Sequence, residues 1–139
     1  MIRWTYFDTS AAVKLFLKKE EHAEDLDQWL AAHAEGRPVT SDLTRTELRR
    51  ALLAANADEQ AWQDAEHWLG NTALIRLTPS LCDAAGRLVN ESGLRSLDAL
   101  HLAAALEINA AMEAFVAYDR RLLSAAEGYE LPVASPGAD

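Results

Sequence analysis

Four acidic residues lie where a predicted strand ends or a predicted helix begins: Asp8, Glu47, Asp98 and Asp119. If the strands are parallel, their carboxyl ends meet at one edge of the sheet, and the four carboxylates can converge there. Carboxylates that lie close together repel one another unless a hard cation occupies the space between them. Mg²⁺ and Mn²⁺ prefer such oxygen ligands. The four acids therefore predict a divalent cation site.

Each acid also has a simpler structural explanation. Asp8 or Asp98 alone is more often the cap or the dipole partner of a helix N-terminus. Glu47 alone suits an ion pair with Arg50 on a solvated helix face. The chain has 22 acidic residues, so some lie near strand ends by chance. The prediction of a cation site consequently depends on the set of four and not on any single residue.

Strand patterns and helix patterns alternate along the chain and would position these acids. Strands are predicted over residues 2–7, 37–41, 74–78, 113–118 and 131–135, and helices over residues 9–17, 20–36, 42–56, 58–71, 79–93, 96–110 and 120–128. Thr9 or Ser10 is the predicted cap of the first helix, Gly36 ends the second, and Gly93 ends the helix that starts at Pro79. The alternation predicts an α/β fold, a three-layer α/β/α sandwich with a mostly parallel central sheet.

Length and composition favour one compact domain. The chain has 139 residues, which suits a single core, predicted over residues 1–134 with a frayed tail at 135–139. The net charge of −9 argues against a non-specific nucleic-acid binder, which is usually basic. No apolar run approaches the about 20 residues that cross a bilayer, so we expect a cytoplasmic protein without membrane contact. The lone Cys82 is expected to be a small buried hydrophobe.

The acids lie in four segments of the chain, YFDTSAAVKLFLKKE, VTSDLTRTELRRAL, LRSLDALHLAAAL and FVAYDRRLL. In this order and at these separations they resemble the acidic blocks of PIN-domain ribonucleases, most closely those of VapC toxins from bacterial toxin–antitoxin modules. The resemblance runs from Ile2 to Leu123 and implies an α/β/α fold around a parallel sheet. It also implies hydrolysis of RNA by in-line attack of a water activated by Mg²⁺, for which Mn²⁺ can substitute.

The resemblance places the metal-binding acids of the family on Asp8, Glu47, Asp98 and Asp119. We expect Asp8 and Asp98 to be direct ligands of the principal ion. Asp119 is expected to share that ion or to hold a second one, and Glu47 to orient water. His101 lies one turn after Asp98, and we expect it to pack or to form a hydrogen bond inside the protein rather than to bind the metal.

Residues beside the acidic segments are candidates for substrate binding: Ser10, Ser41, Arg95 and Arg120. The two serines match positions where relatives place small hydroxyl groups. The two arginines could contact phosphates, although each is as readily a paired surface residue. The resemblance further implies an RNA substrate, a homodimer, and a cognate VapB-like antitoxin whose extended segment crosses the acidic cleft.

Other functions fit the residues less well. Phosphatases that form an aspartyl intermediate need a second Asp two residues after the first, where this chain has Ser10. A receiver-type signalling domain needs a Lys at the end of a late strand, and FVAYD supplies none. Two alternatives within the family stay open: a housekeeping PIN-domain nuclease that processes RNA, and a PIN fold that has lost catalysis and only binds a partner.

Overall fold

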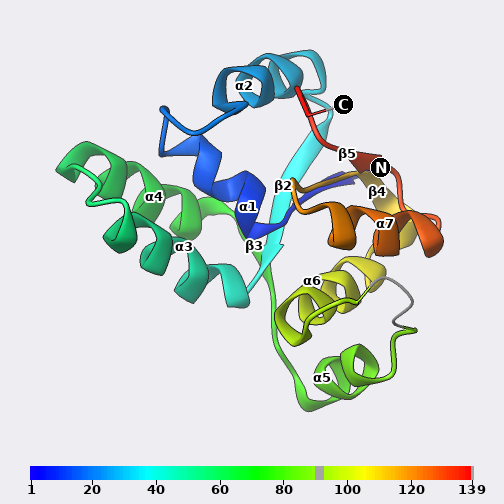
Figure 1. The fold of residues 1–139 in the computed structure, drawn as a ribbon. Coiled ribbons are helices and arrows are strands. Elements are labelled where there is room, and N and C mark those ends of the chain that lie inside the picture. Colours follow the sequence, from blue (N-terminus) through cyan, green and yellow to red (C-terminus); the bar gives the residue numbers. More distant parts are fainter. Residues whose placement is uncertain (90–92, 139) are drawn as a thin grey trace.

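The computed structural model describes residues 1–89 and 93–138. Within those residues the chain forms a five-stranded sheet in the order β3-β2-β1-β4-β5, and every pairing is parallel (Figure 1). The strands are β1 (Arg3–Phe7), β2 (Gly36–Ser41), β3 (Ala73–Ile75), β4 (Met112–Val116) and β5 (Val133–Ala134). The predicted α/β fold with a parallel central sheet is confirmed.

Helices cover both faces of this sheet. One face carries α1 (Thr9–Ala12), the 3₁₀ turn η1 (Val13–Leu15), α2 (Ala23–Ala32), α3 (Leu43–Ala54) and α4 (Glu59–Asn71). The other carries α5 (Pro79–Gly86), α6 (Ser96–Leu106), the 3₁₀ turn η2 (Asn109–Ala111) and α7 (Arg120–Gly128). Figure 1 shows the two groups of helices on opposite sides of the strands. No helix within the described residues is long and apolar enough to span a membrane.

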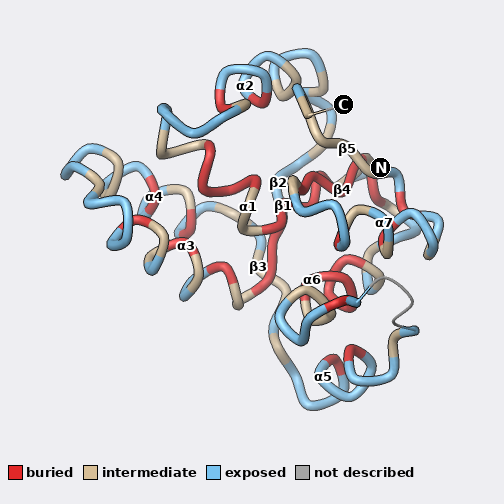
Figure 2. The backbone as a smooth tube through the Cα atoms, in the orientation of Figure 1, coloured by how far each residue is buried: buried red, intermediate tan, exposed pale blue. Residues whose placement is uncertain are grey.

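Neighbouring side chains of the inner strands enter different halves of the core, because side chains alternate across a strand. Tyr6 and Phe115 pack with α5, α6 and α7. Phe7 and Val116, the next residues along β1 and β4, pack with α1 and α2. Figure 2 shows buried residues along these strands, whereas α4 and α5 consist largely of exposed residues. Strands β1 and β4 are therefore held from two sides, which gives their carboxyl ends a rigid base.

The strand order reverses beside the end of β1. The chain moves outward from β1 to β2 and β3, and then returns to the other side of β1 for β4 and β5. In open parallel sheets, ligands bind beyond the carboxyl ends of the strands at such a reversal of strand order. Asp8 follows β1 directly. The strand before Asp119 is shorter than predicted, because β4 ends at Val116 and the chain leaves the sheet before it reaches Asp119.

The second helix is also shorter than the predicted range of residues 20–36. It begins only at Ala23, because His22 has a positive φ of 68° and so lies outside the helical conformation. It ends at Ala32, and Gly36 is the first residue of β2 instead of the helix stop. A Cβ on Gly36 would collide with Thr5 Oγ1 on the neighbouring strand. This glycine is therefore explained by close strand packing.

Three local predictions differ from the structure. The cap of α1 is Asp8, and not Thr9 or Ser10. Helix α5 ends at Gly86 instead of continuing toward Gly93, and residues 90–92 of that predicted helix lie outside the described residues. Cys82 is exposed instead of buried, since it faces away from the core on this short helix.

The C-terminal residues 135–138 lie beside Tyr118 and the start of α2. Tyr118 Oη donates a hydrogen bond of 2.9 Å to the Pro136 carbonyl, and Ala138 N donates one of 2.9 Å to Ser135 O. Asp139 lies outside the described residues. A single domain over residues 1–134 with a frayed tail stays a prediction.

Candidate active site

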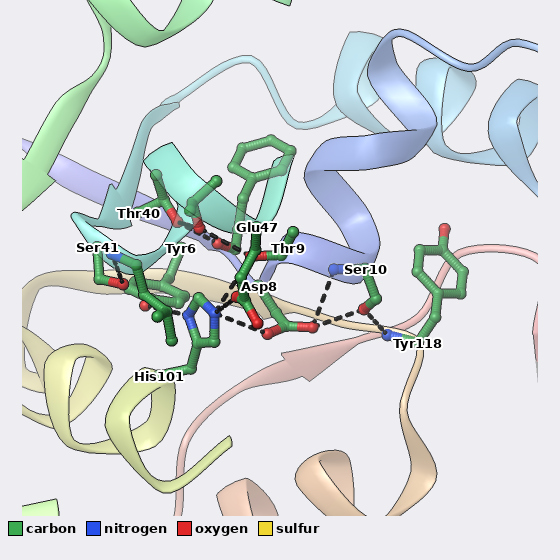
Figure 3. Close-up of polar contacts among 12 residues, drawn as sticks. Tyr6, Asp8, Thr9, Ser10, Thr40, Ser41, Glu47, His101 and Tyr118 are labelled. Atoms are coloured by element: carbon green, nitrogen blue, oxygen red, sulfur yellow. Dashed lines mark hydrogen bonds and ion pairs between the residues drawn. The ribbon is translucent and has the colours of Figure 1, made fainter. Parts of the chain in front are cut away.

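Asp8 lies at the centre of the candidate site. Its side chain follows the last residue of β1, is 5% exposed, and caps the first turn of α1. Asp8 Oδ2 accepts hydrogen bonds from Ser10 N at 3.1 Å and from Ser10 Oγ at 2.6 Å. Ser10 Oγ in turn accepts a bond of 3.0 Å from Tyr118 N (Figure 3). Ser10 therefore joins the end of β1 to the segment that leads into Asp119.

Glu47 reaches the same place from α3. Its Oε1 accepts hydrogen bonds from Thr9 Oγ1 at 2.7 Å and from His101 Nε2 at 2.8 Å. Burial alone would raise the pKa of Glu47, but these two bonds, together with the charge of His101, outweigh burial and lower it. Glu47 is consequently held as a carboxylate that faces the site, and not as a member of a solvated pair with Arg50.

His101 stands between the two acids, as Figure 3 shows. Its side chain is 1% exposed, and Nε2 lies 3.4 Å from Asp8 Oδ1 as well as close to Glu47. Nδ1 lies 2.8 Å from Tyr6 Oη. Burial would lower the pKa of His101, but the bond to Glu47 and the charge of Asp8 raise it. The prediction that His101 is a hydrogen-bonded interior residue is confirmed.

Asp98 and Asp119 complete the acidic edge. Asp98 lies in the first turn of α6 and is partly buried. The pKa of Asp98 is raised, first by burial and then by the negative charges of Asp119, Asp8 and Glu47. Asp119 is exposed and caps α7, where its Oδ1 accepts a bond of 3.0 Å from Leu122 N. Asp8 and Glu47 thus meet at His101, and Asp98 lies within reach of the charges of the other three acids.

The donor chemistry of this group suits a hard cation. As the side chains stand, no three His, Cys, Asp or Glu residues of the described part of the chain form a ready-made metal-binding group. The carboxylates nevertheless repel one another, since the charges of Asp119 and Asp8 add to burial in raising the pKa of Asp98. A divalent cation among them would relieve this repulsion and would receive the oxygen ligands that Mg²⁺ and Mn²⁺ prefer.

Known proteins resemble this chain in sequence and in fold. The PIN domain family model matches residues 5–128. The chain belongs to the PIN-domain family. The protein named Ribonuclease VapC47 of Mycobacterium tuberculosis (strain CDC 1551 / Oshkosh) is 39% identical to it over 135 residues, which are 96% of this chain and 97% of that protein.

Two solved structures share the PIN fold at lower sequence identity. The structure of VapC20 from Mycobacterium tuberculosis, described as a sarcin-ricin loop cleaving toxin, superposes with a TM-score of 0.71 at 18% identity and covers 87% of this chain and 94% of that one. VapBC2 from Rickettsia felis, bound to a DNA fragment from its promoter, gives a TM-score of 0.66 at 17% identity and covers 96% of this chain and 98% of that one.

The predicted substrate-binding residues of this PIN domain occupy different environments. Ser10 lies within the site and contacts Asp8. Ser41 is 0% exposed, and its Oγ accepts a bond of 3.2 Å from Leu43 N at the start of α3. Arg95 is exposed beside a cavity of about 450 Å³ between α5 and α6. Arg120 is exposed beside a different cavity of about 650 Å³ that Tyr118 also lines. The structure therefore does not gather the four residues on one surface.

Three residues of the site were missed by sequence reasoning. Thr9 was a candidate cap only, yet it binds Glu47. Thr44 Oγ1 lies 3.0 Å from Thr9 Oγ1. Because Thr44 precedes Glu47 by one helical turn, the two side chains share a helix face, which is a sequence signal that Thr44 belongs to the site. Tyr6 contacts His101 across 95 residues of sequence, a pairing that only the fold creates.

Proposed function

We propose that this PIN domain is a metal-dependent endoribonuclease of the VapC type, which hydrolyses RNA phosphodiester bonds. The observation that carries the proposal is that Asp8, directly after β1, and Glu47 both contact His101, with Asp98 close enough to Asp8 and Asp119 for their charges to raise its pKa. The ribonuclease name of a full-length relative at 39% identity supports the same chemistry.

Asp8 and Asp98 would hold the principal ion, with Asp119 sharing it or holding a second. Mg²⁺ would fit this set, and Mn²⁺ would substitute for it. When bound, the ion supplies Lewis-acid polarisation of the phosphodiester and a water of lowered pKa.

The protein's own side chains then orient the reactants. The lowered pKa of Glu47 keeps it ionised, so that it can accept a hydrogen bond from the attacking water. Ser10 holds Asp8 by two bonds, which fix its carboxylate beside His101. Arg95 and Arg120 are exposed and would pair with RNA phosphates, whereas the buried Ser41 would support the start of α3.

Replacement of Ser10 by alanine tests how far this orientation matters. The change removes one bond to Asp8 and leaves Tyr118 N without its acceptor. We expect the free energy of unfolding to fall by about 1–2 kcal/mol and RNA cleavage to fall by about 10- to 100-fold. Thermal unfolding and single-turnover cleavage measure the two effects. Ser80→Ala, an exposed serine of α5, is the matched control and should change neither.

The proposal extends to a toxin with an antitoxin. The VapBC2 structure supports a VapB-like partner. An extended segment of that partner would cross the acidic site. The VapC20 toxin supports a structured RNA as substrate. RNA and such a partner would meet the protein in the cytoplasm, and a homodimer would form a shared groove. A housekeeping RNA-processing nuclease and an inactive PIN-fold binding module are the competing functions.

Cleavage of total cellular RNA by the purified protein tests the proposal. We expect cut sites that vanish in EDTA, return with Mn²⁺, and are absent for Asp8→Asn. Equal cleavage by Asp8→Asn would reject the active site, and no cleavage by the intact protein would favour the binding module. Expression in a host cell separates the remaining possibilities. Growth arrest that a co-expressed antitoxin relieves indicates the toxin, and normal growth indicates a housekeeping nuclease.

A further inference from the structure

Both ring nitrogens of His101 are engaged, one by the core and the other by the acidic site. His101 lies on α6 and is 1% exposed. Nδ1 lies 2.8 Å from Tyr6 Oη, and Nε2 lies 2.8 Å from Glu47 Oε1. Tyr6 is 0% exposed, and its ring stacks on Phe115 at 5.4 Å with an interplanar angle of 7°. The imidazole is therefore anchored to the middle of the sheet while its other side faces a candidate catalytic acid.

Glu47 is fixed through one of its two carboxylate oxygens. Oε1 takes both the His101 bond and a bond of 2.7 Å from Thr9 Oγ1. The Thr9 hydroxyl thus donates its one proton to Glu47, while Thr44 Oγ1 lies 3.0 Å from Thr9 Oγ1 on the other side. Among the described residues, no hydrogen bond reaches Glu47 Oε2. Two donors on Oε1 thus set the rotation of the carboxylate and leave Oε2 available.

We propose that His101, anchored by Tyr6, is a positioning residue for Glu47, and that its Nε2–H directs Glu47 Oε2 toward the reacting water. The role does not require a change of protonation, because Nε2 carries a hydrogen both in the imidazolium and in the neutral tautomer whose Nδ1 accepts from Tyr6. Since the task of Glu47 comes from the proposed function, the inference rests on that function.

A matched pair of substitutions separates positioning from packing. In His101→Gln the side-chain amide can reach the place of Nε2 and still donate to Glu47. In His101→Asn the amide is one methylene shorter and reaches only the place of Nδ1. We expect His101→Asn to lower kcat by about 10- to 100-fold with KM unchanged, and His101→Gln to keep kcat within a few-fold of the intact protein. Equal losses in both variants, or losses that follow their unfolding temperatures, would assign His101 a packing role.

A spectroscopic measurement on the intact, metal-free protein avoids any dependence on activity. Long-range ¹H–¹⁵N NMR of the imidazole should show a hydrogen on Nε2, and its resonance should shift in Glu47→Gln. A neutral ring with its hydrogen on Nδ1 would overturn the inference. Failure of the proposed function is seen separately, since the intact protein would then cleave no RNA, while equal cleavage by Glu47→Gln would remove only the role of Glu47. If Glu47→Gln is inactive but His101→Asn is not, only the inference about His101 is wrong.

Discussion

Replacement of Asp98 by asparagine should abolish RNA cleavage while making the metal-free protein more stable. The change removes a ligand for the ion, and we expect a loss of about a thousand-fold in kcat, equivalent to ~4 kcal/mol of transition-state stabilisation. It also removes a charge that the protein holds at some cost, because burial and then Asp119 and Asp8 raise the pKa of Asp98. Single-turnover cleavage and thermal unfolding measure the two effects on one sample.

The sign of the stability change follows from the raised pKa of Asp98. The folded protein binds this proton more tightly than the unfolded chain, so ionised Asp98 destabilises the fold at neutral pH. The advantage of Asp98→Asn should therefore be full at neutral pH. It should shrink as the pH falls through the folded pKa of Asp98 and disappear below the ordinary aspartate value of about 3.9.

Mg²⁺ should raise the unfolding temperature of the intact protein more than that of Asp98→Asn, since a ligand stabilises only the state that binds it. Asp83→Asn replaces an exposed acid of α5 and is the matched control for a lost negative charge. Two results would contradict the assignment of Asp98 as a metal ligand: RNA cleavage by Asp98→Asn, or a loss of stability at neutral pH in Asp98→Asn that Asp83→Asn does not show.

Replacement of Phe115 by alanine should produce the largest loss of stability. Phe115 is 0% exposed in β4, a strand with a partner on each side, and its ring stacks on Tyr6. We expect the free energy of unfolding to fall by about 3–5 kcal/mol, a large part of the about 5–15 kcal/mol that holds a domain together. Urea unfolding followed by circular dichroism measures the change.

Phe115→Leu is the control for Phe115→Ala, because it keeps most of the apolar volume and should cost about 1 kcal/mol. The alanine variant should also cleave RNA more slowly than its fraction of unfolded protein explains. The reason is that Tyr6 loses the ring that holds it against His101. Similar unfolding midpoints for the alanine and leucine variants would show that this part of the core is less tightly packed than the stacking geometry indicates.

Local patterns predicted the sheet and the acidic positions well. The segments around β1 and β4 are rich in aromatic and β-branched residues, and their parallel pairing follows from the alternation with helices. The metal roles of Asp8, Glu47, Asp98 and Asp119 stay a proposal, although the structure places the four in one field.

Contacts between distant parts of the chain could not be predicted. The anchoring of His101 by Tyr6 spans 95 residues, and no periodicity in either segment indicates it. Gly36 was expected to end a helix because glycine is common there, but strand packing against Thr5 determined its place. The end of β4 at Val116 was likewise not indicated by the local residue pattern. The start of α2 at Ala23 follows from the positive φ of His22.

The capping of two helices by site acids bears on how relatives of this chain should be interpreted. Asp8 and Asp119 each begin a helix, so a descendant that has abandoned RNA cleavage would still gain folding stability by keeping them. In the described part of the chain, Asp98 caps no helix, and its charge is held at a cost to stability. Its loss from a homologue, with both caps intact, would mark a pseudoenzyme more surely than any change at Asp8 or Asp119.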